Sequence, residues 1–232
     1  MIKRTVLLTG AAGGLGQVFA KALIQAGYAL VVSDRTAFPA PSAARQITAD
    51  LTDPDAVKHL AAEAGTVDIL INNAAFMPLV PLAQLTSEVW RHIQVVNVEA
   101  PFLLAQALCP GMAARGYGRV INFASSTVWG PPPGMTAYAT SKMAVIGLTR
   151  ALASEFGGSG ITVNAVSPGL TMHDGTLANL PPGAFAGVKA RQFIPRTEEP
   201  EDLVGPLLFL ASEASCFVTG QVINADGGGF GF

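Results

Sequence analysis

The chain has 232 residues, of which 50% are hydrophobic and 13% are charged, and this balance excludes disorder over most of its length. The formal net charge of −2 leaves no basic excess to neutralise phosphates, which argues against nucleic-acid binding driven by charge.

Cysteine and hydropathy patterns set further bounds. Cys109 and Cys216 lie far apart, and with three scattered histidines they indicate no metal site. The first apolar run breaks at Thr9-Gly10, too early for a signal peptide. The longest uncharged stretch, 120–141, contains three consecutive prolines, so it cannot span a bilayer as a helix. We therefore expect a cytoplasmic protein that uses neither a membrane nor a nucleic acid.

Strand and helix patterns alternate along the chain. Short β-rich runs predict strands at 5–8, 29–33, 44–49, 67–71, 119–123, 161–166 and 220–223. Helical spacing of apolar residues predicts helices at 15–26, 54–63, 87–114, 138–156 and 201–212. This alternation predicts an α/β fold in one domain, 1–232, with a Rossmann-type, doubly wound parallel sheet of about seven strands.

Two segments depart from that pattern. The stretch 35–46 is only a dozen residues long and rich in Pro, Ala and Ser, so its crossover helix should be short or missing. The segment 171–196 is rich in Gly and Pro and follows a strand end, where a mobile substrate lid is expected.

The first strand runs into a glycine-rich turn and then a helix. Gly10, Gly14 and Gly16 permit a tight turn whose backbone amides approach a pyrophosphate at a helix N-terminus. Asp34 closes the second strand, where a carboxylate accepts hydrogen bonds from ribose hydroxyls and repels a 2′-phosphate. This favours NAD over NADP, although the neighbouring Arg35 could pair with a 2′-phosphate.

A phenol and an ammonium group share one helix face. Tyr138 and Lys142 are four residues apart, and a cation near a phenol favours the phenolate. We expect this proximity to lower the pKa of Tyr138 enough for acid–base catalysis close to neutral pH. Ser125, at the end of the fifth strand, could face the same substrate oxygen.

Over its full length the chain resembles the short-chain dehydrogenase/reductase family. The matching motifs are Thr9-Gly10-x-x-x-Gly14-Leu15-Gly16, Asp50-Leu51, Asn72-Asn73-Ala74, Asn97, Ser125, Tyr138-x-x-x-Lys142, Pro168-Gly169, Pro200-Glu201-Asp202-Leu203, Thr219-Gly220-Gln221 and Asp226-Gly227-Gly228.

The resemblance implies a role for each catalytic residue. Tyr138 would be the acid–base, and Ser125 would hydrogen-bond the reacting oxygen. Lys142 would lower the pKa of Tyr138 and hold the nicotinamide ribose, while Asn97 would anchor a water in the proton relay.

The resemblance also implies a cofactor site. Its residues would be Gly10, Ala12, Gly14, Leu15, Gly16, Asp34, Asp50, Leu51, Asn73, Ala74, Tyr138, Lys142, Pro168, Gly169 and Thr171. Among them Asp50 and Leu51 would contact adenine, Asn73 the adenosine ribose region, and 168–171 the nicotinamide carboxamide.

Two positions depart from the family pattern. Ala75 stands where glycine is usual and should crowd the cofactor slightly. His173 stands where threonine is usual, so the anchor of the lid is in doubt; this side chain either faces solvent or touches substrate. His59 and His92 are expected at the surface.

The segments expected beside the substrate are apolar. They carry Phe76, Met77, Pro78, Val128, Trp129, Met135, Leu177, Phe185 and Phe193. Such a lining suits a small hydrophobic or aromatic alcohol or ketone, and the motifs look like the branch that oxidises secondary aryl or cyclic alcohols.

Apolar positions on the two long helices exceed what one buried face needs. They are Phe102, Leu103, Leu104, Val145, Leu148 and Leu152. We therefore expect a homo-oligomer, a tetramer or a dimer.

Three functions remain open at this point. The first is an NAD-dependent alcohol dehydrogenase. The second is an NADPH-dependent ketone or 3-oxoacyl reductase, and the third is a nucleotide-binding regulator without turnover.

Overall fold

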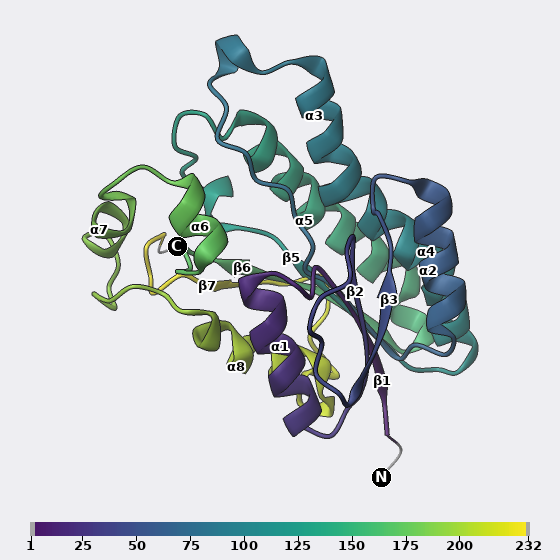
Figure 1. Cartoon of the computed structure of the whole chain (residues 1–232). Helices are drawn as coiled ribbons and strands as arrows, with labels where there is room; N and C mark the ends of the chain where they lie inside the picture. The colour runs from purple at the N-terminus through teal and green to yellow at the C-terminus, as the bar shows by residue number, and fades with distance from the viewer. Residues whose placement is uncertain (1–2, 231–232) are drawn as a thin grey trace.

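The computed structural model describes residues 3–230, which form one parallel sheet between two layers of helices (Figure 1). The strands are β1 (Thr5–Thr9), β2 (Ala29–Asp34), β3 (Ala44–Thr48), β4 (Ile69–Asn72), β5 (Gly118–Phe123), β6 (Ile161–Pro168) and β7 (Val222–Ala225). Their order in the sheet is β3-β2-β1-β4-β5-β6-β7, and every pairing is parallel. This is the doubly wound Rossmann-type fold that the sequence predicts.

The helices are α1 (Gly14–Gln25), α2 (Pro54–Ala64), α3 (Ser87–Gln94), α4 (Ala100–Ala114), α5 (Thr136–Phe156), α6 (Asp174–Asn179), α7 (Ala184–Lys189) and α8 (Val204–Ala211). Single-turn 3-10 helices lie at Leu82–Gln84, Ser126–Val128, Gly157–Ser159, Pro200–Leu203 and Glu213–Ser215.

Alternate residues of the strands supply two large cores, one on each face of the sheet. Leu7 of β1 packs with α2, α4 and α5 on one face, while its neighbours Val6 and Leu8 pack with α1 and α8 on the other. All eight residues of β6 are buried, as expected for a central strand covered on both sides.

The predicted helix 87–114 is interrupted. A π-helical turn, Val95–Glu99, separates α3 from α4 and carries the buried Asn97. Apolar periodicity runs through this turn unchanged, which is why the sequence predicts one helix. Smaller differences are that β4 starts at Ile69, that β7 lies about two residues later than predicted, and that 201–212 begins as a 3-10 turn.

Taken as one continuous helix, α3, the π turn and α4 are long and apolar enough to cross a membrane, judged by length and composition only. This stretch, Ser87–Ala114, is the one such helix found in residues 3–230, and 44% of its most apolar window is buried inside the protein. Leu104, Ala105 and Leu108 of α4 belong to the core. A helix that packs in a protein core meets the same length and composition criteria, so core packing explains the apolar character of this stretch.

Both segments singled out in the sequence have clear structures. No helix joins β2 to β3, as predicted, and Phe38 and Ala40 pack on the α1 side of the sheet instead. The expected lid, 171–196, contains the short helices α6 and α7. Figure 1 shows these two helices standing beside the ends of β6 and β7.

Candidate active site

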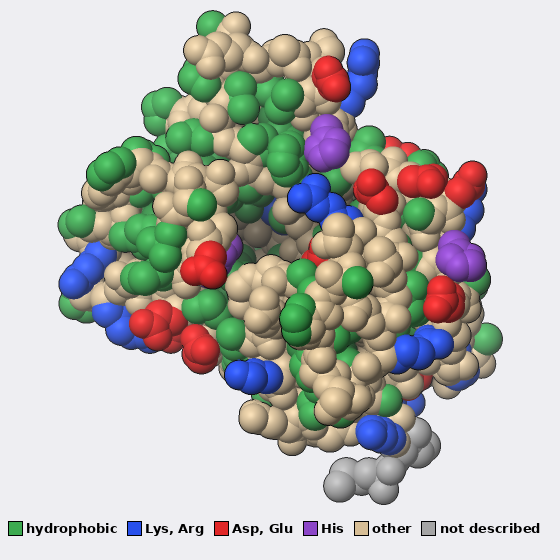
Figure 2. Space-filling model, viewed as in Figure 1, with side chains coloured by type: hydrophobic (Ala, Val, Ile, Leu, Met, Phe, Trp, Pro, Cys, Tyr) green, Lys and Arg blue, Asp and Glu red, His purple; other side chains and the backbone are tan. Residues whose placement is uncertain are grey.

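A large cavity lies at the carboxyl ends of the strands, where ligands bind in doubly wound folds. Its volume is about 1210 Å³, and it extends from the end of β2 past β4 and β5 to the lid. Figure 2 shows this face hollowed near its centre, with hydrophobic side chains over α6 and α7. Every residue that the sequence predicts to bind cofactor lines this one cavity.

The glycine-rich turn is shaped by close backbone packing. Gly10 has φ of +65°, and a Cβ there would lie 2.6 Å from the Ala74 backbone. A Cβ at Gly16 would lie 2.2 Å from the carbonyl oxygen of Gly10. These two glycines are therefore required by the turn itself, which brings backbone amides to the N-terminus of α1.

Acidic side chains line the end of the cavity nearest β2. The Ala12 amide donates to Asp34 Oδ2 at 2.9 Å, so Asp34 is fixed against the glycine-rich turn. Asp50 accepts from the amide and hydroxyl of Thr52, and these bonds lower the pKa of the Asp50 carboxyl. A dinucleotide fits this end, since backbone amides suit its pyrophosphate and carboxylates suit its ribose hydroxyls.

Asn73 lines the same cavity, but its side-chain amide serves the fold. Its Nδ2 donates to the carbonyl oxygens of Thr9 and Gly10, both at 3.0 Å. Asn73 therefore ties the end of β4 to the glycine-rich turn, and any contact with a ribose is additional to this structural role.

Three of the four predicted catalytic side chains converge in the cavity. Ser125 follows β5, and its hydroxyl hydrogen-bonds to the Tyr138 side chain on α5. Lys142 Nζ, one turn further along α5, lies 5.7 Å from the centroid of the Tyr138 ring and donates to Phe123 O at 2.7 Å. The amide and hydroxyl of Thr127 donate to Ser125 Oγ and fix its position.

The ionisation of this cluster differs from the sequence expectation. Burial raises the pKa of Tyr138 to about 12, and the hydrogen bond from Ser125 opposes this only in part. The predicted lowering by Lys142 is thus wrong for the protein alone, because desolvation of a phenol that is 8% exposed outweighs it. Burial also lowers the pKa of Lys142 to about 8.

Asn97 is buried, at 1% exposed, and is not among the residues that line the cavity. Its Oδ1 accepts from the Phe76 amide, and its Nδ2 donates to Phe76 O and to Ser141 Oγ. The Ser141 hydroxyl donates to Tyr138 O, so Asn97 links the loop after β4 to the helix that carries the phenol.

A buried carboxyl that sequence reasoning missed supports the segment after β6. The Gly169 amide donates to Glu198 Oε2 at 2.9 Å, and the Thr171 hydroxyl donates to Oε1 at 2.6 Å. Burial raises the pKa of Glu198 to about 7. In the sequence, Glu198 stands in the charged run Glu198-Glu199-Pro200-Glu201-Asp202, which is typical of an exposed segment, so no pattern signals its burial.

His173 is placed against the glycine-rich turn. A Cβ added at Gly14 would lie 2.5 Å from the Cβ of His173, so the lid lies directly on the turn. Half-burial lowers the pKa of His173, which favours the neutral ring. His173 also lines the cavity, so a contact with substrate stays a prediction, although neither sequence alternative anticipates the contact with the turn. His92 is exposed, as predicted, but also lines the cavity.

The substrate end of the cavity is apolar, but only some of the residues that line it are those that the sequence predicts. Phe76, Met77 and Met135 line the cavity as expected. The remaining predicted residues, Pro78, Val128, Trp129, Leu177, Phe185 and Phe193, do not line it. Residues that the sequence did not single out replace them, namely Leu79, Pro132, Pro133, Leu180, Pro181, Ala184, Gly187, Val188, Arg191 and Phe230.

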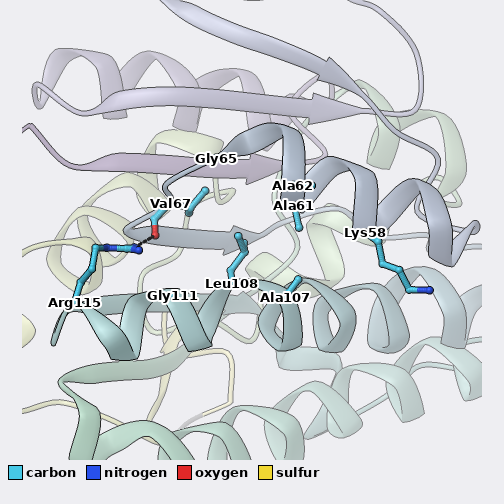
Figure 3. A pocket seen from close by; sticks show the side chains of 9 residues that line it. All are labelled: Lys58, Ala61, Ala62, Gly65, Val67, Ala107, Leu108, Gly111 and Arg115. Carbon is cyan, nitrogen blue, oxygen red and sulfur yellow. Dashed lines mark hydrogen bonds between the residues drawn. The ribbon is translucent and has the colours of Figure 1, made fainter.

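A second pocket of about 300 Å³ lies between α2 and α4, and none of the predicted catalytic residues lines it (Figure 3). Its floor is formed by small apolar side chains, and two cations lie at its ends. Lys58 pairs with Asp55, while Arg115 donates to Val67 O and approaches Asp68. Both charges are already engaged, so we assign the chemistry to the larger cavity.

Comparisons with known proteins agree with this geometry. A family model described as enoyl-(acyl carrier protein) reductase matches residues 10–229. The cis-4-hydroxycyclohexanecarboxylate dehydrogenase of Sinomonas cyclohexanicum is 34% identical over 97% of this chain and 96% of its own.

Two solved structures superpose closely on the chain. One, described as a short chain dehydrogenase/reductase family protein, has a TM-score of 0.91 and 36% identity, covering 99% of this chain and 98% of its own. The other is a gluconate 5-dehydrogenase from Burkholderia cenocepacia J2315 in complex with NADP and tartrate. Its TM-score is 0.92 and its identity 31%, covering 98% of this chain and 95% of its own.

Proposed function

We propose that this chain interconverts small hydrophobic alcohols and their carbonyls with NAD(H). The chain belongs to the short-chain dehydrogenase/reductase family, and it is therefore an NAD(P)-dependent oxidoreductase that acts on CH–OH groups. The observation that supports a catalytic role is the convergence of Ser125, Tyr138 and Lys142 in one cavity. With the catalytic cluster intact, nothing favours a regulator without turnover. The apolar substrate end supports a secondary, aryl or cyclic alcohol.

The residues divide the chemistry of alcohol oxidation. Ser125 hydrogen-bonds the alcohol oxygen, and the Tyr138 phenolate accepts the hydroxyl proton as the carbonyl forms. The ammonium of Lys142 stabilises that phenolate. When bound, oxidised nicotinamide supplies the acceptor for the hydride and a positive charge that lowers the pKa of Tyr138 further.

Tyr138→Phe tests this assignment with a matched control. Turnover of a panel of secondary alcohols and ketones, followed by nicotinamide absorbance, should fall by about 100-fold or more, while cofactor binding persists. Tyr117→Phe, which removes a half-buried hydroxyl beside Arg4 and Arg119, should leave turnover unchanged. Equal losses in both variants would contradict the assignment.

The preference for NAD rests on Asp34, whose carboxylate lines the cavity and would repel a 2′-phosphate. Asp34→Ala should lower the NAD/NADP ratio of kcat/KM by about tenfold or more, and Asp55→Ala, at an exposed position outside the cavity, should not. An unchanged ratio in Asp34→Ala would show that another residue reads the cofactor.

The alternative is an NADPH-dependent ketone or 3-oxoacyl reductase. The specific observation in its favour is that Arg35 also lines the cavity, beside Asp34. A wild-type preference for NADPH, with faster reduction of a 3-oxoacyl thioester than oxidation of any alcohol, would support this alternative over the first.

We also propose that the protein is a cytoplasmic homo-oligomer. Leu104, Val145 and Leu152 are buried within the chain itself, so these three side chains no longer support the oligomer that the sequence predicts. Phe102 on α4 and Met143 on α5 remain 42% and 44% exposed, and a second copy would cover them. Light scattering during size exclusion tests this, since a monomer mass would overturn it.

A further inference from the structure

A basic side chain that the proposed mechanism does not use, Arg191, lines the cavity beside α7. The cavity-lining residues at and after α7 are Ala184, Gly187, Val188 and Arg191, whose spacing of three, one and three places them on one side of a helical path. The Arg191 amide donates to Val188 O, which continues that path beyond the helix. The lid therefore presents to the cavity an apolar wall that ends in a guanidinium.

The position of Arg191 relative to the reacting groups follows from Phe230. The guanidinium carbon lies 5.7 Å from the centroid of the Phe230 ring. That ring lies on Gly130, where an added Cβ would be 2.4 Å from it. Gly130 belongs to the loop that begins at Ser125, so Arg191 lies on the side of the cavity that this loop forms. The Phe230 amide donates to Asp226 Oδ2, which holds the ring in place.

The carboxylates that line the cavity are confined to one end, where Arg35 also lies. Its acidic lining residues, Asp34 and Asp50, both lie beside the ends of β2 and β3. At the substrate end the described lining residues include Lys142 and Arg191 but no carboxylate. Within residues 3–230 Arg191 forms no ion pair, since the six pairs present involve other side chains. Its charge is thus free to bind an anionic group.

From this arrangement we propose that the substrate is a hydroxy acid: an alcohol with an apolar body and a carboxylate that Arg191 binds. This inference rests on the proposed function. A guanidinium binds a carboxylate through two parallel hydrogen bonds, which suits a single arginine at the end of an apolar wall. A phosphate ester is a poorer match, because the other lining side chains from 180 to 188, namely Leu180, Pro181, Ala184 and Val188, supply no further donors.

Three probes that differ in one group test the proposal. They are 4-(1-hydroxyethyl)benzoate, its methyl ester and 1-phenylethanol, each assayed for NAD-dependent oxidation by wild type, Arg191→Gln, Arg191→Lys and Lys189→Gln. We expect wild type to favour the acid over the ester. Arg191→Gln should lower the acid-to-ester ratio of kcat/KM by about 10- to 100-fold, chiefly through the KM of the acid. Arg191→Lys should keep part of the preference.

Lys189→Gln is the matched control, since Lys189 is an exposed lid cation that does not line the cavity, and the ratio should stay at its wild-type value. An equal ratio in wild type and Arg191→Gln, with all three probes oxidised, would overturn the proposal while the proposed function stands. A rise in the KM of NAD in Arg191→Gln without a change in the ratio would assign Arg191 to the cofactor instead. If no alcohol is oxidised by wild type, the proposed function itself fails.

Discussion

Replacing Lys142 with methionine separates the charge of this side chain from its size. Lys142 Nζ lies 5.7 Å from the centroid of the Tyr138 ring, and at an effective dielectric of about 20 two unit charges at that separation attract by about 3 kcal/mol. Since one pKa unit corresponds to about 1.4 kcal/mol, we expect an ammonium at about this distance from the phenolate charge to oppose the effect of burial on the Tyr138 pKa by about two units. This gain holds only while Lys142 is protonated, which is below its own pKa of about 8.

The assay is the pH dependence of kcat/KM for alcohol oxidation. In Lys142→Met the rising limb should move up by about two pH units, and the rate near neutral pH should fall about 100-fold. Lys142→Arg keeps the positive charge, so its rising limb should lie close to the wild-type pH. The KM of NAD, measured in each variant, reports any separate loss of cofactor binding. A limb that stays at the wild-type pH in Lys142→Met would refute the electrostatic reasoning.

Three more predictions concern stability. Glu198→Gln should raise the Tm by several degrees near pH 8, and the gain should fade as pH falls below about 7, because burial raises the pKa of this carboxyl to about 7 and the folded state favours its neutral form; a gain that is the same in acid would contradict this. Gly16→Ala should lower the Tm by several degrees more than Gly13→Ala, since the added Cβ meets a backbone oxygen at 2.2 Å in the first and at 3.5 Å in the second; equal values would show that the turn relaxes. Asn97→Ala should destabilise the chain by about 2–4 kcal/mol in urea, because it leaves both backbone groups of Phe76 without their partner; a loss below about 0.5 kcal/mol would mean that water replaces the amide.

The sheet could be predicted because burial on both faces leaves an unmistakable pattern. Each strand is a short apolar run such as Val6-Leu7-Leu8, and a parallel sheet requires both faces to be covered. The break in the helix at Val95–Glu99 could not be predicted, because a π turn inserts one residue without changing the composition around it. The helices of the lid were missed for another reason. At six residues each, α6 and α7 are too short to show a helical period.

The catalytic part of the site could be predicted from the sequence, because the chemistry requires particular residue types at a fixed spacing. Ser125, Tyr138 and Lys142 meet as the motif requires, although the motif says nothing about desolvation, which sets the direction of the Tyr138 pKa. The contacts of Glu198 and Arg191 depend on how the chain after β6 returns to the sheet. Such long-range placement leaves no periodic signal, so these two residues emerge only from the structure.

The contact between His173 and Gly14 also bears on the timing of turnover. One short stretch, 171–196, both presses on the glycine-rich turn through His173 and supplies the wall that ends at Arg191. If a dinucleotide displaces this stretch on entry, the pocket for the second reactant is completed only when the stretch returns to the position seen here. The kinetics should accordingly be ordered, with the nucleotide arriving first and departing last, and its release should limit the rate of a fast alcohol.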